Sequence, residues 1–156
     1  STVGIAKGIV RLADEGKRFN LALSLHAPTD EQRDRIMDIN KTNPIEELVE
    51  AMNYFYEKTG NKITFEYILL NGFNDSLTDA ANLAKLCERV PAYVNLIEYN
   101  KVEGVSLSRT GKANRDAFLQ YLRNHGVNSK VRRSRGKDID AACGQLANKN
   151  TQIAQD

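Results

Sequence analysis

The amino-acid sequence predicts an α/β domain built on a mainly parallel sheet, because strand-like and helical segments alternate along the chain. Four short runs have the two-residue alternation, or the β-branched and aromatic content, of strands. The stretches between them have helical periodicity, and several of them end at glycine or proline. With 156 residues, 41% hydrophobic and 27% charged, the chain is long and apolar enough for one core. This composition argues against a disordered or a collagen-like chain.

The first predicted helix covers residues 5–16 and ends at Gly16, in the left-handed conformation that glycine adopts without strain. The first predicted strand covers residues 19–26. Its alternation places four apolar side chains on one face and four others, including Ser24 and His26, on the opposite face. One face of this strand is therefore expected to be buried, while the other carries polar groups.

The later elements follow the same rules. The second long helix is predicted to begin with Pro44 in its first turn and Asn43 as its cap. The remaining predictions are helices over 30–38, 44–59, 77–90 and 114–125, and strands over 63–70, 93–100 and 127–132. Four strands with helices between them cannot close an eight-stranded barrel. The sheet is therefore expected to be open or to be part of a barrel.

Charge is distributed unevenly, although the net charge of the whole chain is only +2. Residues 1–100 carry 11 Lys and Arg against 15 Asp and Glu, a net −4. Residues 101–137 carry 10 against 2, a net +8, and residues 138–156 carry 1 against 3, a net −2. A concentrated positive field of this kind indicates a polyanionic partner, or a solvated basic face.

The two cysteines, Cys87 and Cys143, are too few for a disulfide framework. A reducing, cytoplasmic compartment is the simplest expectation. No apolar run approaches the roughly 18 residues of a membrane helix, so no membrane partner is expected. Nothing at the start of the chain has the pattern of a signal peptide.

Candidate functional residues follow the ends of the predicted strands. Parallel α/β sheets bind ligands at the carboxyl ends of their strands. Ser24 and His26 lie at the end of the first strand, and Asn100 ends the third. The loop after the fourth strand carries several arginines and then Cys143. These segments are therefore expected to converge on one edge of the sheet.

Two of these signals have two interpretations. His26 either binds a ligand by hydrogen bonding or satisfies a buried backbone group. The run 130–137 contains five cations in eight residues, which are Lys130, Arg132, Arg133, Arg135 and Lys137. Such a run either tracks a nucleic-acid backbone or forms a solvated edge strand, where cations discourage aggregation. Composition alone does not separate the alternatives.

Isolated chemical groups are equally ambiguous. Cys143 stands beside glycine and near arginines, so it is either a nucleophile with a lowered pKa or a small buried hydrophobe. Cys87 lies on an apolar helix face and is expected in the core. Glu66 lies in the middle of a strand among apolar neighbours, and if it is buried it needs a partner. A single carboxylate without a visible partner is weak evidence for acid–base catalysis.

Four segments together resemble one family, the C-terminal half of the RlmN-type radical SAM methyltransferases, in the right order and spacing. The block Asp138-Ile-Asp-Ala-Ala-Cys-Gly-Gln-Leu146 is the most specific of them. The segments are Ser1-Thr-Val-Gly4, Ser24-Leu-His-Ala-Pro28, residues 65–75 with Phe65-Glu-Tyr-Ile-Leu-Leu, and Val131-Arg-Arg-Ser-Arg-Gly-Lys-Asp-Ile-Asp-Ala-Ala-Cys-Gly-Gln-Leu146. The resemblance implies that residues 1–146 are the C-terminal portion of a radical SAM partial (β/α) barrel. Residues 147–156 are expected to be a polar tail that frays.

Site residues follow from the same resemblance. Those that match the family's S-adenosylmethionine (SAM) contacts are Ser1, Ser24, Leu25, His26 and Asn100. Cys143 matches the cysteine that first accepts a methyl group from SAM. The basic run 130–137 would then hold RNA phosphates while the target base turns out of its stack.

The family methylates C2 of one adenine in 23S rRNA and of an adenine in certain tRNAs. The methyl group passes through the cysteine, and a radical made from a second SAM at a [4Fe–4S] cluster completes the transfer. This chemistry suits the target, because C2 of adenine is not nucleophilic and the cofactors supply the difficult radical step. The implied partners are both RNAs and an electron donor that reduces the cluster.

The chain lacks the family's Cys-x3-Cys-x2-Cys cluster motif, its resolving cysteine and its catalytic glutamate. These features belong upstream of Ser1, so the chain is expected to be part of a longer protein. Alone it is expected to bind no cluster and to transfer no methyl group. The alternatives are the sister activity that methylates C8 of the same adenine, and a non-catalytic RNA-binding module.

Overall fold

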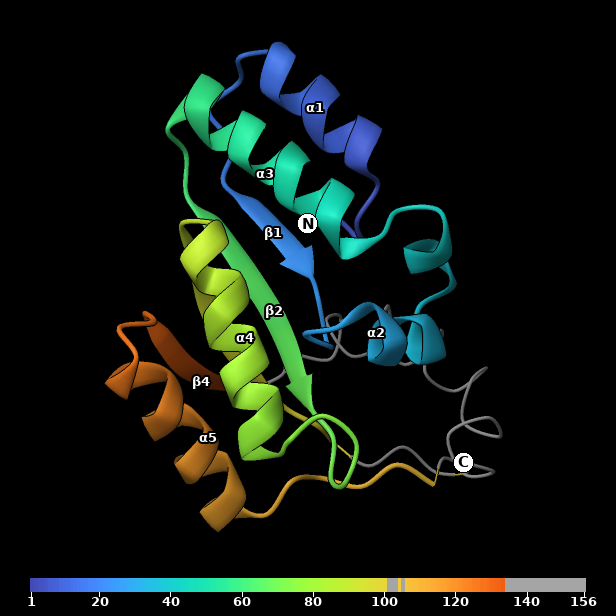
Figure 1. The fold of residues 1–156 in the computed structure, drawn as a ribbon, viewed down its shortest axis with the longest axis vertical. Coiled ribbons are helices and arrows are strands. Elements are labelled where there is room, and N and C mark those ends of the chain that lie inside the picture. Colours follow the sequence, from blue (N-terminus) through green and yellow to red (C-terminus); the bar gives the residue numbers. More distant parts are fainter. Residues whose placement is uncertain (101–103, 105, 134–156) are drawn as a thin grey trace.

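The computed structural model describes residues 1–100, 104 and 106–133, and these form one four-stranded parallel sheet with helices between the strands. The strands lie in their sequence order, each parallel to the next (Figure 1). The elements are α1 (Ala6–Asp14), β1 (Leu21–Ser24), α2 (Asp30–Ile36), the 3-10 helix η1 (Asp38–Lys41), α3 (Ile45–Thr59), β2 (Ile63–Leu69), α4 (Leu77–Arg89), β3 (Ala92–Glu98), α5 (Lys112–Asn124) and β4 (Ser129–Arg133). The predicted α/β class is confirmed.

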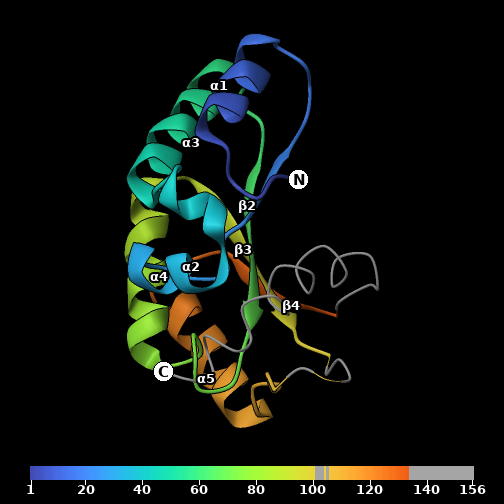
Figure 2. The ribbon, with the colours of Figure 1, turned by 90° about the vertical axis from the view of Figure 1, so that its right-hand side faces the viewer.

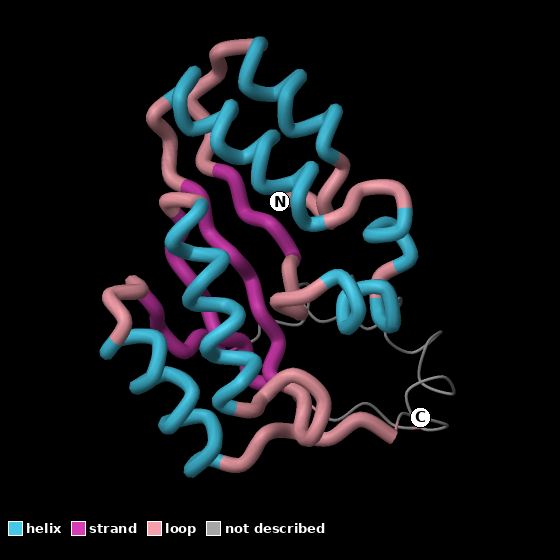
Figure 3. Tube along the Cα trace, in the orientation of Figure 1, coloured by secondary structure: helices cyan, strands magenta, loops and turns pink. Residues whose placement is uncertain are grey.

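The helices gather on one face of the sheet, as the side view in Figure 2 shows. The main core lies between this face and α1, α3, α4 and α5 (Figure 3). Every second residue of the strands contributes to it, including Leu23, Phe65 and Val94. Tyr67 of β2 packs against Phe118 of α5, with ring centroids 5.5 Å apart. The helices therefore bury one face of the sheet, while polar residues lie on part of the other face.

The opposite face carries residues of the other alternation phase. The strand register places Ser24, Glu66, Asn95 and Lys130 side by side across the four strands, and we call these four residues the polar row. Neighbouring strands lie about 4.8 Å apart, so side chains in such a row reach one another. The register therefore assembles residues that are far apart in the sequence.

A second, smaller cluster of buried residues lies at the carboxyl ends of the strands. It joins Ile68 and Ile97 to Ile36 of α2. The other buried members are Ala27, Met37, Leu70, Tyr99 and Leu107. The segments that follow β1, β2 and β3 are therefore packed together rather than free in solvent.

Helix boundaries follow local chemistry at several points. Gly60 ends α3 with φ 65°, directly after the predicted last residue of this helix. Ser76 and Asp79 form a reciprocal capping box at the start of α4. The predicted cap at Asn43 is wrong, because its Oδ1 accepts from the backbone N–H of Ala6 at 2.9 Å, and Pro44 is the N-cap instead. The side chain of Asn43 therefore bonds to a residue 37 positions earlier in the sequence and does not cap α3.

The ends of two strands also differ from the prediction. β1 ends at Ser24, so His26 lies beyond it and does not share a strand face with Ser24. β3 ends at Glu98, so Asn100 lies two residues past the strand. On its outer edge, β1 is joined by Thr2, which donates to Ala22 O at 2.8 Å and accepts from Ser24 N at 2.9 Å. No described helix is long and apolar enough to cross a membrane.

Candidate functional site

The polar row has an ion pair at its centre. The carboxylate of Glu66, 14% exposed, accepts from Asn95 Nδ2 at 3.1 Å and from Arg132 Nη2 at 3.2 Å. Arg132 lies two residues beyond Lys130 on β4 and reaches back across the sheet. Glu66, which has no visible partner in the sequence, thus has two partners in the fold, one on β3 and one on β4. Only the strand register reveals them, because they stand 29 and 66 residues away.

His26 is buried in the turn that follows β1, with a backbone φ of 57°. It is the one described non-glycine residue with a positive φ. The backbone N–H of Ile68 donates to its Nδ1 at 3.0 Å, and its carbonyl accepts from Asn74 Nδ2 at 2.8 Å. Strained conformations of this kind persist only where the surroundings hold them, and they are common at ligand sites. Ile68 near the end of β2 therefore fixes the ring of His26, and Asn74 in the loop after β2 fixes its backbone.

The hydrogen bond from Ile68 also fixes the protonation of the imidazole. Because Nδ1 accepts, the single proton of the neutral ring is on Nε2. Burial, and then the positive charge of Arg33, lower the pKa of His26 from 6.5 to about 3. Among residues 1–100, 104 and 106–133, the hydrogen bond found for the ring is the one that Nδ1 accepts from Ile68. The ring thus satisfies a buried backbone group with one nitrogen and carries its proton on the other.

This neutral ring makes the stability of the fold depend on pH. The pKa of His26 is about 3 in the folded chain and 6.5 in the unfolded chain, so only the unfolded chain gains a proton below neutrality. The contribution of the neutral His26 ring to the free energy of unfolding is complete above pH 6.5 and is lost as the pH falls towards 3. We expect a loss of about 1.4 kcal/mol from about pH 7.5 to about pH 5.5. Urea unfolding across this range measures it.

The matched variant is His26→Asn. Asparagine tolerates a positive φ, its side-chain oxygen replaces the acceptor Nδ1, and it does not titrate in this range. The pH dependence between about pH 7.5 and about pH 5.5 is therefore expected to disappear in this variant. An equal slope in both proteins would contradict the assignment to His26.

The other predicted SAM contacts lie near this turn to different degrees. Leu25 is buried, its N–H donates to Glu66 O at 3.0 Å, and its carbonyl accepts from Arg33 Nε at 3.1 Å. It therefore offers a ligand little more than the second lone pair of that carbonyl. Ser1 is exposed beside Thr2, and Asn100 is exposed just past β3. Ser1 lies beside β1, whereas Asn100 follows β3, which is separated from β1 by β2. Their convergence on one cofactor stays a prediction.

The predicted RNA-binding residues differ in their surroundings. Lys130 is exposed in the polar row, whereas Arg132 is half-buried and pairs with Glu66. Arg133 pairs its backbone with Glu98 at the end of β4. Arg135, Lys137 and Cys143 lie outside the described residues, as does the predicted tail 147–156.

Part of the positive charge of residues 101–137 is used inside the fold. Arg109 and Arg115 both bind the carboxylate of Glu98. Burial raises the pKa of Glu98, but the hydrogen bonds and the positive charges of these two arginines together outweigh burial and lower it. Arg123 donates to the backbone oxygen of Ser129 at the start of β4. The net charge of this segment therefore overstates the number of cations that are free to bind a polyanion.

A metal cluster has no ligand set in the described part of the chain, where no group of three His, Cys, Asp or Glu side chains comes together. Cys87 packs against the core, and burial raises the pKa of its thiol to about 12. A thiol with that pKa stays protonated at neutral pH and is a poor nucleophile. The predicted core position of Cys87 is confirmed in part, because the residue packs against the core but is only partly buried.

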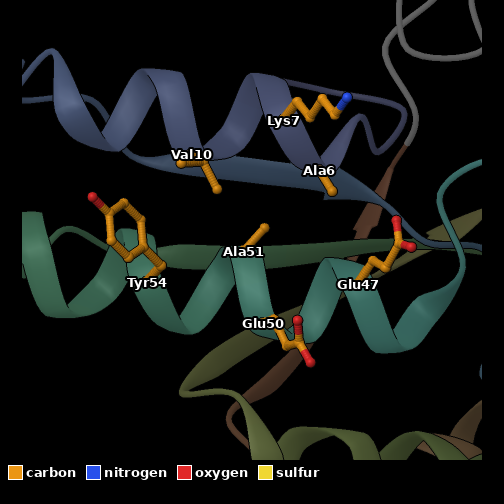
Figure 4. A pocket seen from close by; sticks show the side chains of 7 residues that line it. All are labelled: Ala6, Lys7, Val10, Glu47, Glu50, Ala51 and Tyr54. Atoms are coloured by element: carbon orange, nitrogen blue, oxygen red, sulfur yellow. The ribbon is translucent and has the colours of Figure 1, made fainter.

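The structure also has a groove between α1 and α3, away from the strand ends. It encloses about 420 Å³, and Figure 4 shows the side chains of Val10, Ala51 and Tyr54 lining it together with Glu47 and Glu50. It shares no residue with the polar row or with the turn at His26. The groove is therefore separate from the candidate site.

Curated proteins similar to this chain agree on one activity. The chain is 54% identical over 150 residues to a protein of Salinibacter ruber described as a probable dual-specificity RNA methyltransferase RlmN. Proteins with the same description from Geobacillus kaustophilus and Thermus thermophilus are 49% and 50% identical. These alignments cover 94–95% of this chain but only 40–41% of each relative. The chain thus spans about two fifths of the length of these relatives. No protein-family model matches it.

Solved structures give the same answer for the fold. A crystal structure of a radical SAM methyltransferase from Sphaerobacter thermophilus superposes with a TM-score of 0.84 at 42% identity, over 93% of this chain and 42% of that one. A domain of a pyruvate-formate lyase-activating enzyme from Bacteroides vulgatus superposes with a TM-score of 0.65 at 13% identity, a likeness of fold alone. From these relatives and this fold, the chain belongs to the family of RlmN-type radical SAM methyltransferases.

Proposed function

We propose that this chain is part of a radical SAM enzyme that methylates C2 of an adenine in 23S rRNA and in tRNA. The observation that carries the proposal is the turn after β1, where Ser24 and His26 stand at the carboxyl edge of a parallel sheet of this family. The names of the relatives support an RNA substrate. The choice of C2 and of the two RNAs rests on the resemblance of the sequence motifs.

The groups at this edge suit SAM, which carries ribose hydroxyls and an adenine ring with polar edges. The His26 ring stays neutral at physiological pH and carries its proton on Nε2, which can donate to a ligand. The Ser24 hydroxyl and the exposed Asn100 amide each offer both a donor and an acceptor. Ser1 stands beside Thr2, which pairs with β1. In this proposal these four side chains orient the cofactor against the open face of the sheet.

Cys143 is the first methyl acceptor in this proposal. When bound, SAM and the [4Fe–4S] cluster supply the methyl group and the radical chemistry that protein side chains lack. The cluster ligands belong to a part of the protein outside this chain, which also meets the electron donor. The chain itself contributes the thiol, the SAM contacts and a basic surface.

RNA phosphates are assigned to Lys130, Arg133, Arg135 and Lys137. Arg132 is shared between this role and its pair with Glu66, so a phosphate would have to compete with a carboxylate for it. Guanidinium groups suit phosphates because their fork of N–H donors matches two phosphate oxygens. The exposed Lys130 is the described cation best placed to contribute a simple charge.

The experiment uses the complete protein with a reconstituted cluster, SAM carrying a labelled methyl group, and separate 23S rRNA and tRNA substrates. We expect the label on C2 of adenine in both RNAs, located by nuclease digestion and mass spectrometry against synthetic standards. A label on C8 would replace the proposal with the sister activity. RNA binding without transfer, in a protein whose cluster is intact, would favour the non-catalytic binding module.

A further inference from the structure

Arg33 is a fully buried cation behind the candidate site. It extends from α2 and is 0% exposed. Its guanidinium donates to three backbone carbonyls and one side chain. The acceptors are Leu25 O at 3.1 Å, Ser24 O at 3.0 Å, Val3 O at 2.6 Å and Asn40 Oδ1 at 2.8 Å. One side chain therefore joins the N-terminal segment, the end of β1 and η1.

In the described part of the chain, Asn40 links this charge to two aspartates. Asn40 accepts from Arg33 and donates onward to Asp30 at 3.0 Å and Asp34 at 2.7 Å. Burial lowers the pKa of Arg33 to about 10, and the two aspartates oppose that effect, so the group stays charged at neutral pH. A buried charge of this kind is costly, and a packed apolar side chain often serves stability as well. Its geometry, which fixes three carbonyls at once, suggests a different use.

The N-terminal segment is shaped to accept the guanidinium. Gly4 has a φ of 104°, and a Cβ there would lie 3.0 Å from Arg33 Nη2 and 3.1 Å from Leu48 Cδ1. Thr2, two residues earlier, pairs with Ala22 and Ser24 of β1. The close approach of this backbone to Arg33 therefore requires glycine at position 4.

The carbonyls that Arg33 holds belong to the segments that carry the assigned SAM contacts. Ser24 and Leu25 are two of those contacts themselves, and Val3 follows Ser1 by two residues. We propose that Arg33 is a positioning residue for SAM, which fixes segment 2–4 against segment 24–26 so that Ser1, Ser24 and His26 face one cofactor. This inference rests on the proposed function.

The mechanism is preorganisation of the backbone. Arg33 does not need to touch SAM, because four of its five N–H donors are engaged by protein acceptors. Without the guanidinium fork, two backbone segments would have to be ordered when SAM binds, and binding would bear that entropic cost. Lysine keeps the charge but has no planar fork, so it cannot hold three carbonyls in the same geometry.

The test measures the SAM dissociation constant of the complete, cluster-loaded protein by equilibrium binding. The variants are Arg33→Met, Arg33→Lys and Gly4→Ala, which disturbs the same contact from the other side. We expect SAM to bind about tenfold or more weakly in Arg33→Met and Gly4→Ala, with a smaller loss in Arg33→Lys. RNA affinity is expected to stay within about twofold of wild type, because the assigned phosphate contacts lie on and after β4.

Two controls separate positioning from general stability. Leu122→Ala truncates a fully buried side chain of α5 and lowers stability far from the SAM contacts. Gly8→Ala adds a methyl group to α1, where the nearest atoms lie 3.7 Å away in ordinary contact. Both variants are expected to keep wild-type SAM affinity, measured well below their unfolding temperatures.

Each outcome has a meaning. Unchanged SAM affinity in folded Arg33→Met, or an equal loss in Leu122→Ala, would overturn the positioning role. If Arg33→Met does not fold, Arg33→Lys and Gly4→Ala decide by the same comparison. A wild-type protein that binds RNA but no SAM would instead refute the proposed function, and the positioning role with it.

Discussion

Replacing Cys143 with alanine is expected to abolish methyl transfer by the complete protein, with a loss of more than about 10³-fold. In the proposed first step, the thiol proton leaves to solvent and the thiolate sulfur forms a bond to the methyl carbon of SAM. The sulfonium carbon–sulfur bond breaks, and its electron pair stays on the sulfur of S-adenosylhomocysteine. Without the sulfur, the methyl group has no acceptor in the chain.

Cys87→Ala is the matched control. Cys87 is the other cysteine of the chain, and its thiol packs against the core with its pKa raised to about 12. Transfer is expected to survive this change. RNA affinity should be equal to wild type in both variants, as should SAM affinity. Transfer that persists in Cys143→Ala would remove the assigned acceptor and favour the RNA-binding module.

Asn74→Ala is expected to lower the free energy of unfolding by about 3–5 kcal/mol. Asn74 is 0% exposed and its side chain satisfies three backbone groups. Its Nδ2 donates to His26 O at 2.8 Å and Ile68 O at 2.7 Å, while its Oδ1 accepts from Leu70 N at 2.8 Å. Alanine leaves all three groups buried without these partners, and each such group costs about 1–3 kcal/mol.

The control for this variant is Asn71→Ala in the same loop. Asn71 is exposed, and its amide makes a single side-chain hydrogen bond, to Ser108 Oγ at 3.2 Å. Its removal is expected to change stability by less than about 0.5 kcal/mol. Equilibrium urea unfolding compares the two variants. A loss below about 1 kcal/mol in Asn74→Ala would mean that water or a shifted backbone replaces the lost bonds.

The sequence predicted the elements well where the signals are local. Gly60 ends α3 because a left-handed residue is needed there, and the apolar face of α4 packs Cys87 against the core. The predicted class and parallel direction depend on such local patterns and on the alternation of helix and strand. These parts of the fold needed no knowledge of distant contacts.

Features set by distant contacts were missed. Nothing near His26 in the sequence marks a positive φ, because the bonds that hold it come from Ile68 and Asn74. The partners of Glu66 become visible only when the register aligns β2, β3 and β4. Arg33 had the pattern of an ordinary helix cation, and its burial depends on the carbonyls of Val3 and Ser24. The roles of Cys143, of all the proposed SAM contacts and of the basic run stay predictions.

The most direct test of the account is whether SAM places a methyl group on Cys143. The complete, cluster-loaded protein is incubated with labelled SAM without RNA, digested, and the peptide that contains Cys143 is analysed by mass spectrometry. We predict one labelled methyl group on Cys143 and none on Cys87, and its transfer to adenine once RNA and reductant are added. An unmodified Cys143 in a protein that still methylates RNA would contradict the account.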